Sequence, residues 1–537
     1  MKIRFLIDFI LLPLIVLSVL GINPLFANQN LMVSSDIQFV QFAQTDTDEN
    51  SLEGFGDEDD DSDEDSDLEG FDDEDNDLEG YDDDSEENTA VIETLEEIDV
   101  SKILSESEKS SALTFGGFIK EDIAYGFAYE DPEWAKIKSI LNLTFDYKVS
   151  EIWKSKLNIN GFYDYAYQYR GRAEFTDETL EAYESEFEVR DFFIDGSFSN
   201  QTYFKFGRQG IAWGQSNTSQ INDMLNPRYQ RELGIVDLED ARLPVVASKY
   251  TAVFDSFDFN VVAVHEIRSN KIATEGSEFD PFISLRAMGI QIRNEEVPDS
   301  NIENTEYALR LSKLFNGGDL ALIYSSTYED SPYLDFYKLT KPNIYYGQLA
   351  VTPKFKRIRT LGITGSMVSG SWIFKTELAR KYGVAFSRSD IREQLVTIPL
   401  GTYNEDTNII KTWSEKNQNQ GMLGIDYSGI SDLTITFEGI LSRIEDYDDN
   451  LASKETSGLV YTSIDYSALN DTFKAKFILM HFTDNNGDVY RINLDYDLID
   501  ALSGSLGAIY YEANDNEALL YPYRKNDKYF ASIKYSF

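Results

Sequence analysis

The charged residues whose types and spacing could serve a function are concentrated between positions 203 and 245. A strand-like run at 203–206 precedes a loop of mixed charge, and Pro244 suits the start of the next strand. If membrane strands flank this loop, its charges need solvation, which the loop gains by folding into a lumen and narrowing a pore. An external loop braced by ion pairs is the alternative. The expected constriction residues are Arg208, Asp223, Arg228, Arg231, Glu239, Asp240 and Arg242.

Two of these arginines are the expected lumen cations. Arg208 follows the strand-like run and Arg242 ends the loop, so both lie close to the wall in sequence. Their expected carboxylate partners are Glu239 and Asp240. Rings of charge of this kind set ion selectivity in a pore.

Residues that support covalent chemistry are scarce. The chain has no cysteine, which excludes disulfides and thiolate metal sites, and its two histidines are His265 and His481. His265 precedes Glu266 in an expected strand, so their side chains point to opposite faces. There is no G-x-S-x-G elbow, P-loop or zinc-binding helix motif. We therefore expect no catalytic residue, cofactor or metal, and a membrane hydrolase using one of the histidines is the remaining enzymatic alternative.

The last eleven residues, 527–537, have the pattern of a strand between lipid and a polar lumen. Apolar residues occupy one face and polar or charged residues the other, with Phe530 as the exception. An edge strand of a soluble sandwich is the alternative. The final Phe, with Tyr at the third position from the end, resembles the C-terminal signature of bacterial outer-membrane β-barrels. That resemblance implies recognition by the barrel assembly machinery, through Tyr529, Ile533, Tyr535 and Phe537.

The same alternation recurs through residues 115–537 and predicts an all-β fold, a transmembrane antiparallel β-barrel of about 16–18 strands. Many segments reach the roughly 9–11 residues that cross a bilayer at a tilt, and short connections alternate with long ones. The raw count is eighteen, and sixteen is acceptable because 330–358 and 456–484 are ambiguous. The candidate strands are 115–129, 136–149, 153–170, 187–199, 201–213, 244–256, 257–268, 304–316, 318–329, 358–369, 371–384, 418–429, 431–445, 456–468, 471–484, 487–499, 501–513 and 526–537.

Two segments are expected before the barrel. A basic start, an apolar run and Ala27 predict a signal peptide at 1–27, with a retained membrane anchor as the alternative. Residues 28–114 are expected to be a disordered acidic periplasmic segment, because 46–87 holds 25 acidic residues and no Lys or Arg. We expect residues 44–100 to meet a periplasmic or inner-membrane exporter partner, with a solvated spacer as the alternative. Calcium binding is a weak expectation, and the charge disfavours nucleic acid.

Residues 203–245 also carry a resemblance to a known family. The relevant motifs are Gly207-Arg208-Gln209, Trp213-Gly214, Asn226-Pro227 and Glu239-Asp240-Ala241-Arg242-Leu243-Pro244. This order resembles a large, mostly uncharacterised family of proteobacterial outer-membrane barrels. Its members are frequently associated with exporters of the resistance-nodulation-division type, and the architecture resembles the alginate-export porin. The resemblance implies a barrel in the outer membrane and fixes no substrate.

The sequence therefore predicts a porin-like channel or export conduit in the bacterial outer membrane, with its amino-terminal segment in the periplasm. Its cargo would be a solute or a lipid-like molecule that passes a charged constriction unmodified. A non-conducting barrel scaffold, whose acidic segment recruits periplasmic partners, is the alternative from a different class. Substrate, direction of transport and oligomeric state are not readable from the residues.

Overall fold

The computed structural model describes residues 112–130, 132–234, 241–338, 349–396, 411–484 and 486–537. The predicted signal peptide and residues 28–111 of the predicted acidic segment lie outside the described residues. Glu239 and Asp240, two expected constriction residues, lie outside them as well.

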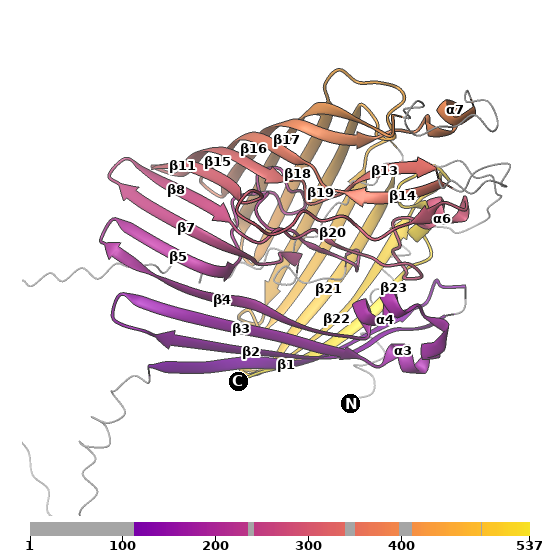
Figure 1. Ribbon diagram of the computed structural model, residues 1–537. Helices are drawn as coiled ribbons and strands as arrows, with labels where there is room; N and C mark the ends of the chain where they lie inside the picture. The colour runs from indigo at the N-terminus through magenta and orange to yellow at the C-terminus, as the bar shows by residue number, and fades with distance from the viewer. Residues whose placement is uncertain (1–111, 131, 235–240, 339–348, 397–410, 485) are drawn as a thin grey trace, which may run out of the picture. The chain divides into compact units, whose positions relative to one another are not determined.

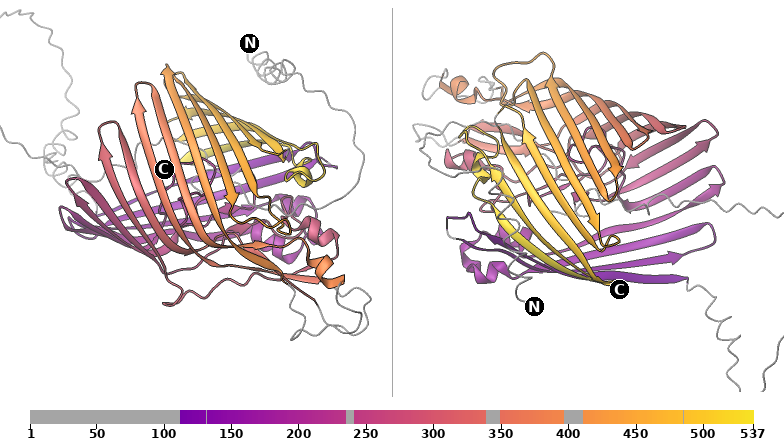
Figure 2. Two further views of the ribbon diagram at one scale, coloured as in Figure 1. Left: turned by 90° about the horizontal axis from the view of Figure 1, so that it is seen from above. Right: turned by 180° about the vertical axis from the view of Figure 1, so that it is seen from behind.

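Eighteen strands form one antiparallel sheet that closes into a barrel (Figure 1). Each strand pairs with its neighbours in chain order, and the last strand pairs antiparallel with the first (Figure 2). In this pairing Ile533 lies opposite Glu121. The predicted fold class is confirmed, at the upper end of the expected strand number. The strands are β1 (Leu113–Gly126), β2 (Glu133–Lys148), β3 (Trp153–Asp164), β4 (Ser185–Ser199), β5 (Thr202–Gln209), β7 (Val245–Phe254), β8 (Phe257–Val264), β11 (Glu306–Phe315), β12 (Gly318–Tyr328), β15 (Arg357–Ser369), β16 (Trp372–Ser387), β17 (Trp413–Ile430), β18 (Leu433–Ile444), β19 (Thr456–Ala468), β20 (Phe473–Phe482), β21 (Gly487–Ile499), β22 (Leu502–Glu512) and β23 (Lys528–Ser536).

Short elements occupy the long connections. β13 and β14 form a small sheet with β10, and β6 pairs with β9, so the described residues of the ambiguous region 330–358 add no barrel strand before β15 begins at Arg357. Among the described residues, no helix has the length and apolar character needed to cross a membrane. The short elements are α3 (Ala166–Tyr169), η2 (Arg172–Glu174), α4 (Asp177–Tyr183), β6 (Tyr229–Gln230), β9 (Lys271–Ile272), α6 (Ile283–Ala287), β10 (Gln291–Ile292), β13 (Tyr333–Lys338), β14 (Leu349–Lys354), α7 (Ile391–Val396) and η3 (Tyr521–Tyr523).

The third strand ends earlier than its sequence predicts. The tyrosines of 163–169 continue the alternation, but β3 stops at Asp164 and the chain turns into α3. Asp164 Oδ1 accepts hydrogen bonds from the backbone N–H groups of Ile137 and Ala166, which ends the strand pairing there. Tyr167 is then buried against Leu180 and Tyr183 instead of facing lipid.

Inward and outward faces differ as the alternation requires. On β23, Tyr529, Ile533 and Tyr535 are exposed to between 46% and 49%, whereas Lys528, facing inward, is 4% exposed. Period-two alternation places all three apolar side chains on the outside of the barrel. Among the described strands, the closed sheet also leaves no unpaired edge along the wall. Both features suit a barrel with lipid outside and a polar lumen.

The two ends of the barrel carry different connections (Figure 1). At one end the strands are joined by tight turns, such as Asn316-Gly317 between β11 and β12, where Gly317 takes a φ of 83°. Asn-Gly is the pair that favours such a two-residue hairpin. At the other end lie the long connections, including 210–244 and 265–305. Functional side chains are therefore expected where these long connections meet the lumen wall.

Candidate functional site

The connection from β5 to β7 folds into the barrel. Ile211, Trp213, Met224 and Leu225 are buried against inward-facing apolar residues of β7, β8, β11 and β12. This apolar stripe explains the direction of the loop, since it removes large side chains from water. We call residues 210–234 the lumen loop.

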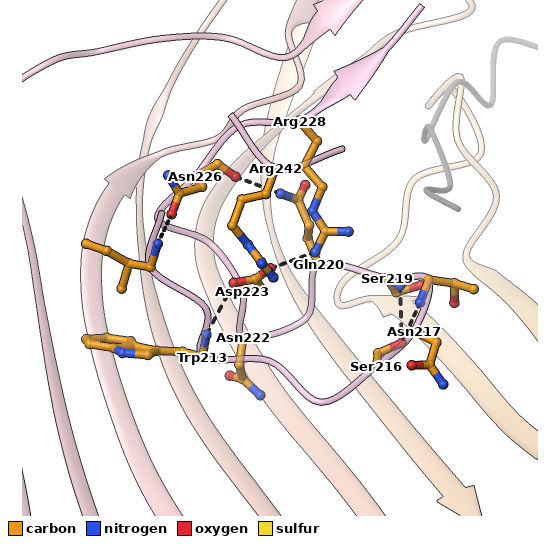
Figure 3. Close-up of polar contacts among 12 residues, drawn as sticks. Trp213, Ser216, Asn217, Ser219, Gln220, Asn222, Asp223, Asn226, Arg228 and Arg242 are labelled. Carbon is orange, nitrogen blue, oxygen red and sulfur yellow. Dashed lines mark hydrogen bonds and ion pairs between the residues drawn. The ribbon is translucent and has the colours of Figure 1, made fainter. Parts of the chain in front are cut away.

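An Asn-Pro pair joins the beginning and end of the connection. Asn226 Oδ1 accepts a hydrogen bond from the Ile211 N–H at 2.7 Å (Figure 3). Its Nδ2 donates to the Leu243 carbonyl at 2.8 Å. The Leu243 N–H in turn donates to the Pro227 carbonyl at 2.8 Å. One buried amide therefore holds both ends of the connection together.

Asp223 is the ionic centre of the lumen loop. Its Oδ2 accepts hydrogen bonds from Arg228 at 2.7 Å and Arg242 at 2.8 Å, and its Oδ1 accepts one from the Trp213 N–H at 3.3 Å (Figure 3). Burial favours the neutral acid, but the two guanidinium groups outweigh it and hold the pKa of Asp223 below its usual range. Three of the expected constriction residues, Asp223, Arg228 and Arg242, thus pair with one another within the connection from β5 to β7.

Two carboxylates of the opposite wall bind the loop backbone. Glu377 on β16 accepts hydrogen bonds from the N–H groups of Gln215, Ser216 (2.7 Å) and Asn222 (3.1 Å). Glu438 on β18 accepts from the N–H of Asn217 at 3.0 Å and from its side-chain amide at 2.8 Å. Both glutamates are 0% exposed. Buried carboxylates require such partners, and here the loop backbone supplies them.

Sequence reasoning missed this pair of glutamates. The available signal was a glutamate on the polar face of each predicted strand, 371–384 and 431–445. That signal identifies a lumen carboxylate but not its partners, which lie 155 to 222 positions away in the chain.

The far end of the lumen loop reaches strands on another side of the barrel. Glu232 pairs with Lys136 and, at 3.1 Å, with Lys138, both on β2. Burial opposes ionisation, but the two lysines prevail and keep the pKa of Glu232 well below its usual range. In the closed order of strands, β2 and β16 are nine positions apart among eighteen, so the loop crosses the lumen from wall to wall.

Further ion pairs tie the loops to β4. Arg231 donates to Glu186 at 2.7 Å, and Lys271, from the connection 265–305, pairs with the same carboxylate. Arg268 donates to Glu188 at 2.7 Å. Wall and loop thus meet through long side chains of opposite charge.

A cavity of about 80 Å³ lies between the loops and strands β1–β4. This exceeds the space that a single water needs. Its charged lining is balanced, with four acids and four bases: Asp122, Glu186, Glu188, Glu232, Lys136, Lys138, Arg190 and Lys271. Most of these residues alternate at every second position of a strand, a signal present in the sequence but not used for the prediction.

The expected lumen cations lie elsewhere than predicted. Arg208 is opposite Phe192 in the β4–β5 register, and Phe192 is 61% exposed on the outer face, so Arg208 also points outward. It pairs with Glu266 at 2.5 Å. The expectation for Arg208 is therefore wrong, because strand alternation places it on the face of Phe204 and Phe206.

The remaining predicted residues divide between two places. Arg242 forms its described ion pair with Asp223. Its expected partners, Glu239 and Asp240, lie outside the described residues. Arg231 reaches the wall beside the cavity. Among the described members of the predicted set, Arg231 is thus linked through its side chain to a residue that lines the cavity, Glu186.

The two histidines lie on the outer face. Ser248 Oγ is 2.8 Å from His265 Nε2, and His481 Nδ1 is 2.8 Å from Asp488. The register places Ser248 opposite Phe206, on the lipid-facing side of the wall. In the described part of the chain, no carboxylate contacts the second ring nitrogen of His265, so the dyad lacks the orienting group of a catalytic triad.

Comparisons with known proteins come to the following. No curated protein matches this chain. The chain is similar to the solved structure of OccAB1 from Acinetobacter baumannii, with 7% identity, a TM-score of 0.46, and coverage of 80% of this chain and 97% of that chain. It is also similar to OpdK from Pseudomonas aeruginosa, with 9% identity, a TM-score of 0.42, and coverage of 79% and 98%. The expected association with exporters and the likeness to the alginate-export porin stay predictions. The family described as "Protein of unknown function (DUF1302)" matches residues 129–537, and the chain belongs to this family.

Proposed function

We propose that this protein is a porin-like channel of the bacterial outer membrane, with a passage between the lumen loop and strands β1–β4. The closed barrel with an apolar outer face supports the membrane location. The observation that carries the proposal is the lumen loop itself. It is held across the barrel by Glu377 and Glu438 on one side and by Lys136 and Lys138 on the other.

The lining of the passage indicates the class of solute. The cavity residues supply equal numbers of acidic and basic groups, so the net field along the passage is weak. A small, hydrophilic solute can exchange hydrogen bonds with such groups, whereas a lipid-like molecule would leave them unsolvated. We therefore favour small polar solutes over the lipid-like cargo, with selectivity set by size and local charge.

Planar-bilayer recording of the refolded protein tests the proposal. Wild type should give small, discrete conductance steps. The double variant Glu377→Ala/Glu438→Ala should give larger and noisier steps, because the loop backbone loses its two acceptors and leaves the wall. Glu445→Ala is the matched control, since Glu445 pairs with Arg380 and contacts no residue of the lumen loop in the described structure. Silent bilayers from folded wild type and from the folded double variant would favour the non-conducting scaffold.

The Ser248–His265 contact gives the hydrolase alternative one specific observation. A serine hydroxyl beside an imidazole is the arrangement of an activated nucleophile. Phospholipid or ester turnover by the wild type that disappears in both Ser248→Ala and His265→Ala would establish it. Turnover that persists in either variant would assign the contact to structure alone.

A further inference from the structure

Glu121 faces the lipid side of the barrel. In the β1–β23 register it lies opposite Ile533, which is 46% exposed on the outer face. Its neighbours on the same face of β1 are Ile119 and Ile123, exposed to 48% and 38%, and Glu121 itself is exposed. A carboxyl group therefore lies among isoleucines.

The carboxyl group is inside the apolar band and not at its edge. Aromatic pairs mark both ends of this face, Phe115 with Phe537 at 5.7 Å between ring centroids and Tyr125 with Trp134 at 5.4 Å. Glu121 is six residues from Phe115 and four from Tyr125. At about 3.3 Å per residue these separations are about 20 Å and about 13 Å along the strand. Aromatic girdles flank the hydrocarbon region of such barrels.

Other outward charges have a different setting. Arg208 is the last residue but one of β5 and pairs with Glu266. His481 is the last residue but one of β20 and pairs with Asp488. Both pairs lie toward the loop end, and each joins a basic side chain to a carboxylate.

Within the described residues, Glu121 has a single hydrogen-bond partner. Ser139 Oγ, on the outer face of β2, donates to its Oε2 at 2.7 Å. A neutral carboxyl group offers one donor and several acceptor positions, and a hydroxyl offers one donor and two. In the described part of the chain, the donor of a neutral carboxyl at this position and the acceptor positions of the hydroxyl therefore have no partner. Ionisable groups in such positions are rare and usually face a protein partner.

We propose that the outer face of β1, β2 and β23 around Glu121 is the interface of a homodimer in the membrane. The arrangement of Glu121 and Ser139 indicates that the binding partner is a second copy of this chain. Glu121 and Ser139 lie side by side on adjacent strands, so a two-fold axis along the membrane normal between them places each Glu121 opposite the partner's Ser139. Each carboxyl then donates to the partner's hydroxyl, and each hydroxyl donates to its own carboxyl, which closes a ring of four hydrogen bonds.

Variants at position 121 test the ring. Glu121→Gln keeps a donor and an acceptor and should keep the dimer, whereas Glu121→Leu should give monomers that remain folded, because leucine suits a lipid-facing position. The full chain is purified in a mild detergent, its mass is measured by analytical ultracentrifugation, and folding is checked by heat-modifiable gel mobility. Monomeric wild type, a three-copy assembly, or a Glu121→Leu variant with unchanged mass would each overturn the proposal.

Cross-linking in intact membranes provides an independent measurement. Because the chain has no cysteine, a single cysteine is a unique probe. Leu141→Cys, two residues from Ser139 and 45% exposed, should form dimers with a short bis-maleimide. Leu423→Cys on β17, 70% exposed on another part of the wall, is the matched control and should stay monomeric. Equal yields at both positions would contradict a specific interface. Since each barrel has its own lumen, this result is separate from the conductance result.

Discussion

Strands β16 and β18 hold the lumen loop by a different chemistry from strands β2 and β4. On the first side, two carboxylates with 0% exposure accept hydrogen bonds from backbone N–H groups and short polar side chains of the loop. On the second side, lysines, arginines and glutamates pair through long side chains around a cavity. Backbone donors cannot move without unfolding the loop, whereas long ion pairs can exchange partners or water. We infer that the first side fixes the loop and the second side forms the passage.

Removal of the charge on Asp223 should weaken the attachment of the lumen loop more than any other substitution described below. In Asp223→Asn, Arg228, whose side chain is 4% exposed, loses its carboxylate partner. Leaving one partner of a buried ion pair uncompensated costs about 3–5 kcal/mol. We expect a lower denaturant midpoint together with larger, unstable conductance.

The exposed residue Asp449 supplies the control for this measurement. Asp449→Asn should unfold at the wild-type denaturant concentration. If the two variants unfold together, the Asp223 ion pairs do not brace the loop.

Glu377→Gln should have the next largest effect. The substitution retains one acceptor but places an amide N–H₂ against donors from Ser216 and Asn222. Unsatisfied buried groups cost about 1–3 kcal/mol, so thermal stability should fall and mean conductance should rise. A Glu377→Gln protein with wild-type conductance and a lower melting temperature would separate the wall contact from control of the passage.

Lys138→Gln tests the passage side and should alter selectivity more than stability. Glu232 keeps Lys136 as a partner, so the substitution leaves its carboxylate paired and should cost less stability than Asp223→Asn. The loss of a lumen cation should shift the reversal potential in a salt gradient toward cation preference. Lys474→Gln, an exposed lysine near the turn end of β20, is the control. An equal shift in both variants would place the selective region outside the cavity.

The fold was predictable because strand alternation is local. Each of the eighteen barrel strands overlaps a predicted segment, and the longest error, at 165–170, arose where Asp164 captures two backbone N–H groups. The site was less predictable, because its contacts join residues such as Ser216 and Glu377 that are 161 positions apart. Arg208 shows a different failure. Its outward direction follows from the alternation of Phe204 and Phe206, whereas its position at the start of the charged loop favours the lumen.

A half-buried carboxylate on a loop shows a pKa shift in the opposite direction. Asp527, between β22 and β23, accepts a hydrogen bond from the Tyr511 N–H at 2.9 Å and contacts no cation among the described residues. Burial raises the pKa of Asp527 to about 6, with this one hydrogen bond opposing the shift. Glu232, with two lysines, shifts the other way. The folded state therefore binds the proton of Asp527 more tightly than the unfolded state, whose aspartate pKa is about 3.9.

Asp527→Asn should consequently show a small, pH-dependent gain in stability. The contribution of the protonated acid is complete below about pH 4 and is lost as pH rises through about 6. At pH 7.5 the variant should exceed wild type by about 1 kcal/mol, a value reduced for partial exposure, and at pH 4 the two should coincide. Denaturant titration at both pH values is the measurement. A gain of equal size at both would mean that the asparagine improves packing and that proton binding by Asp527 is not linked to folding.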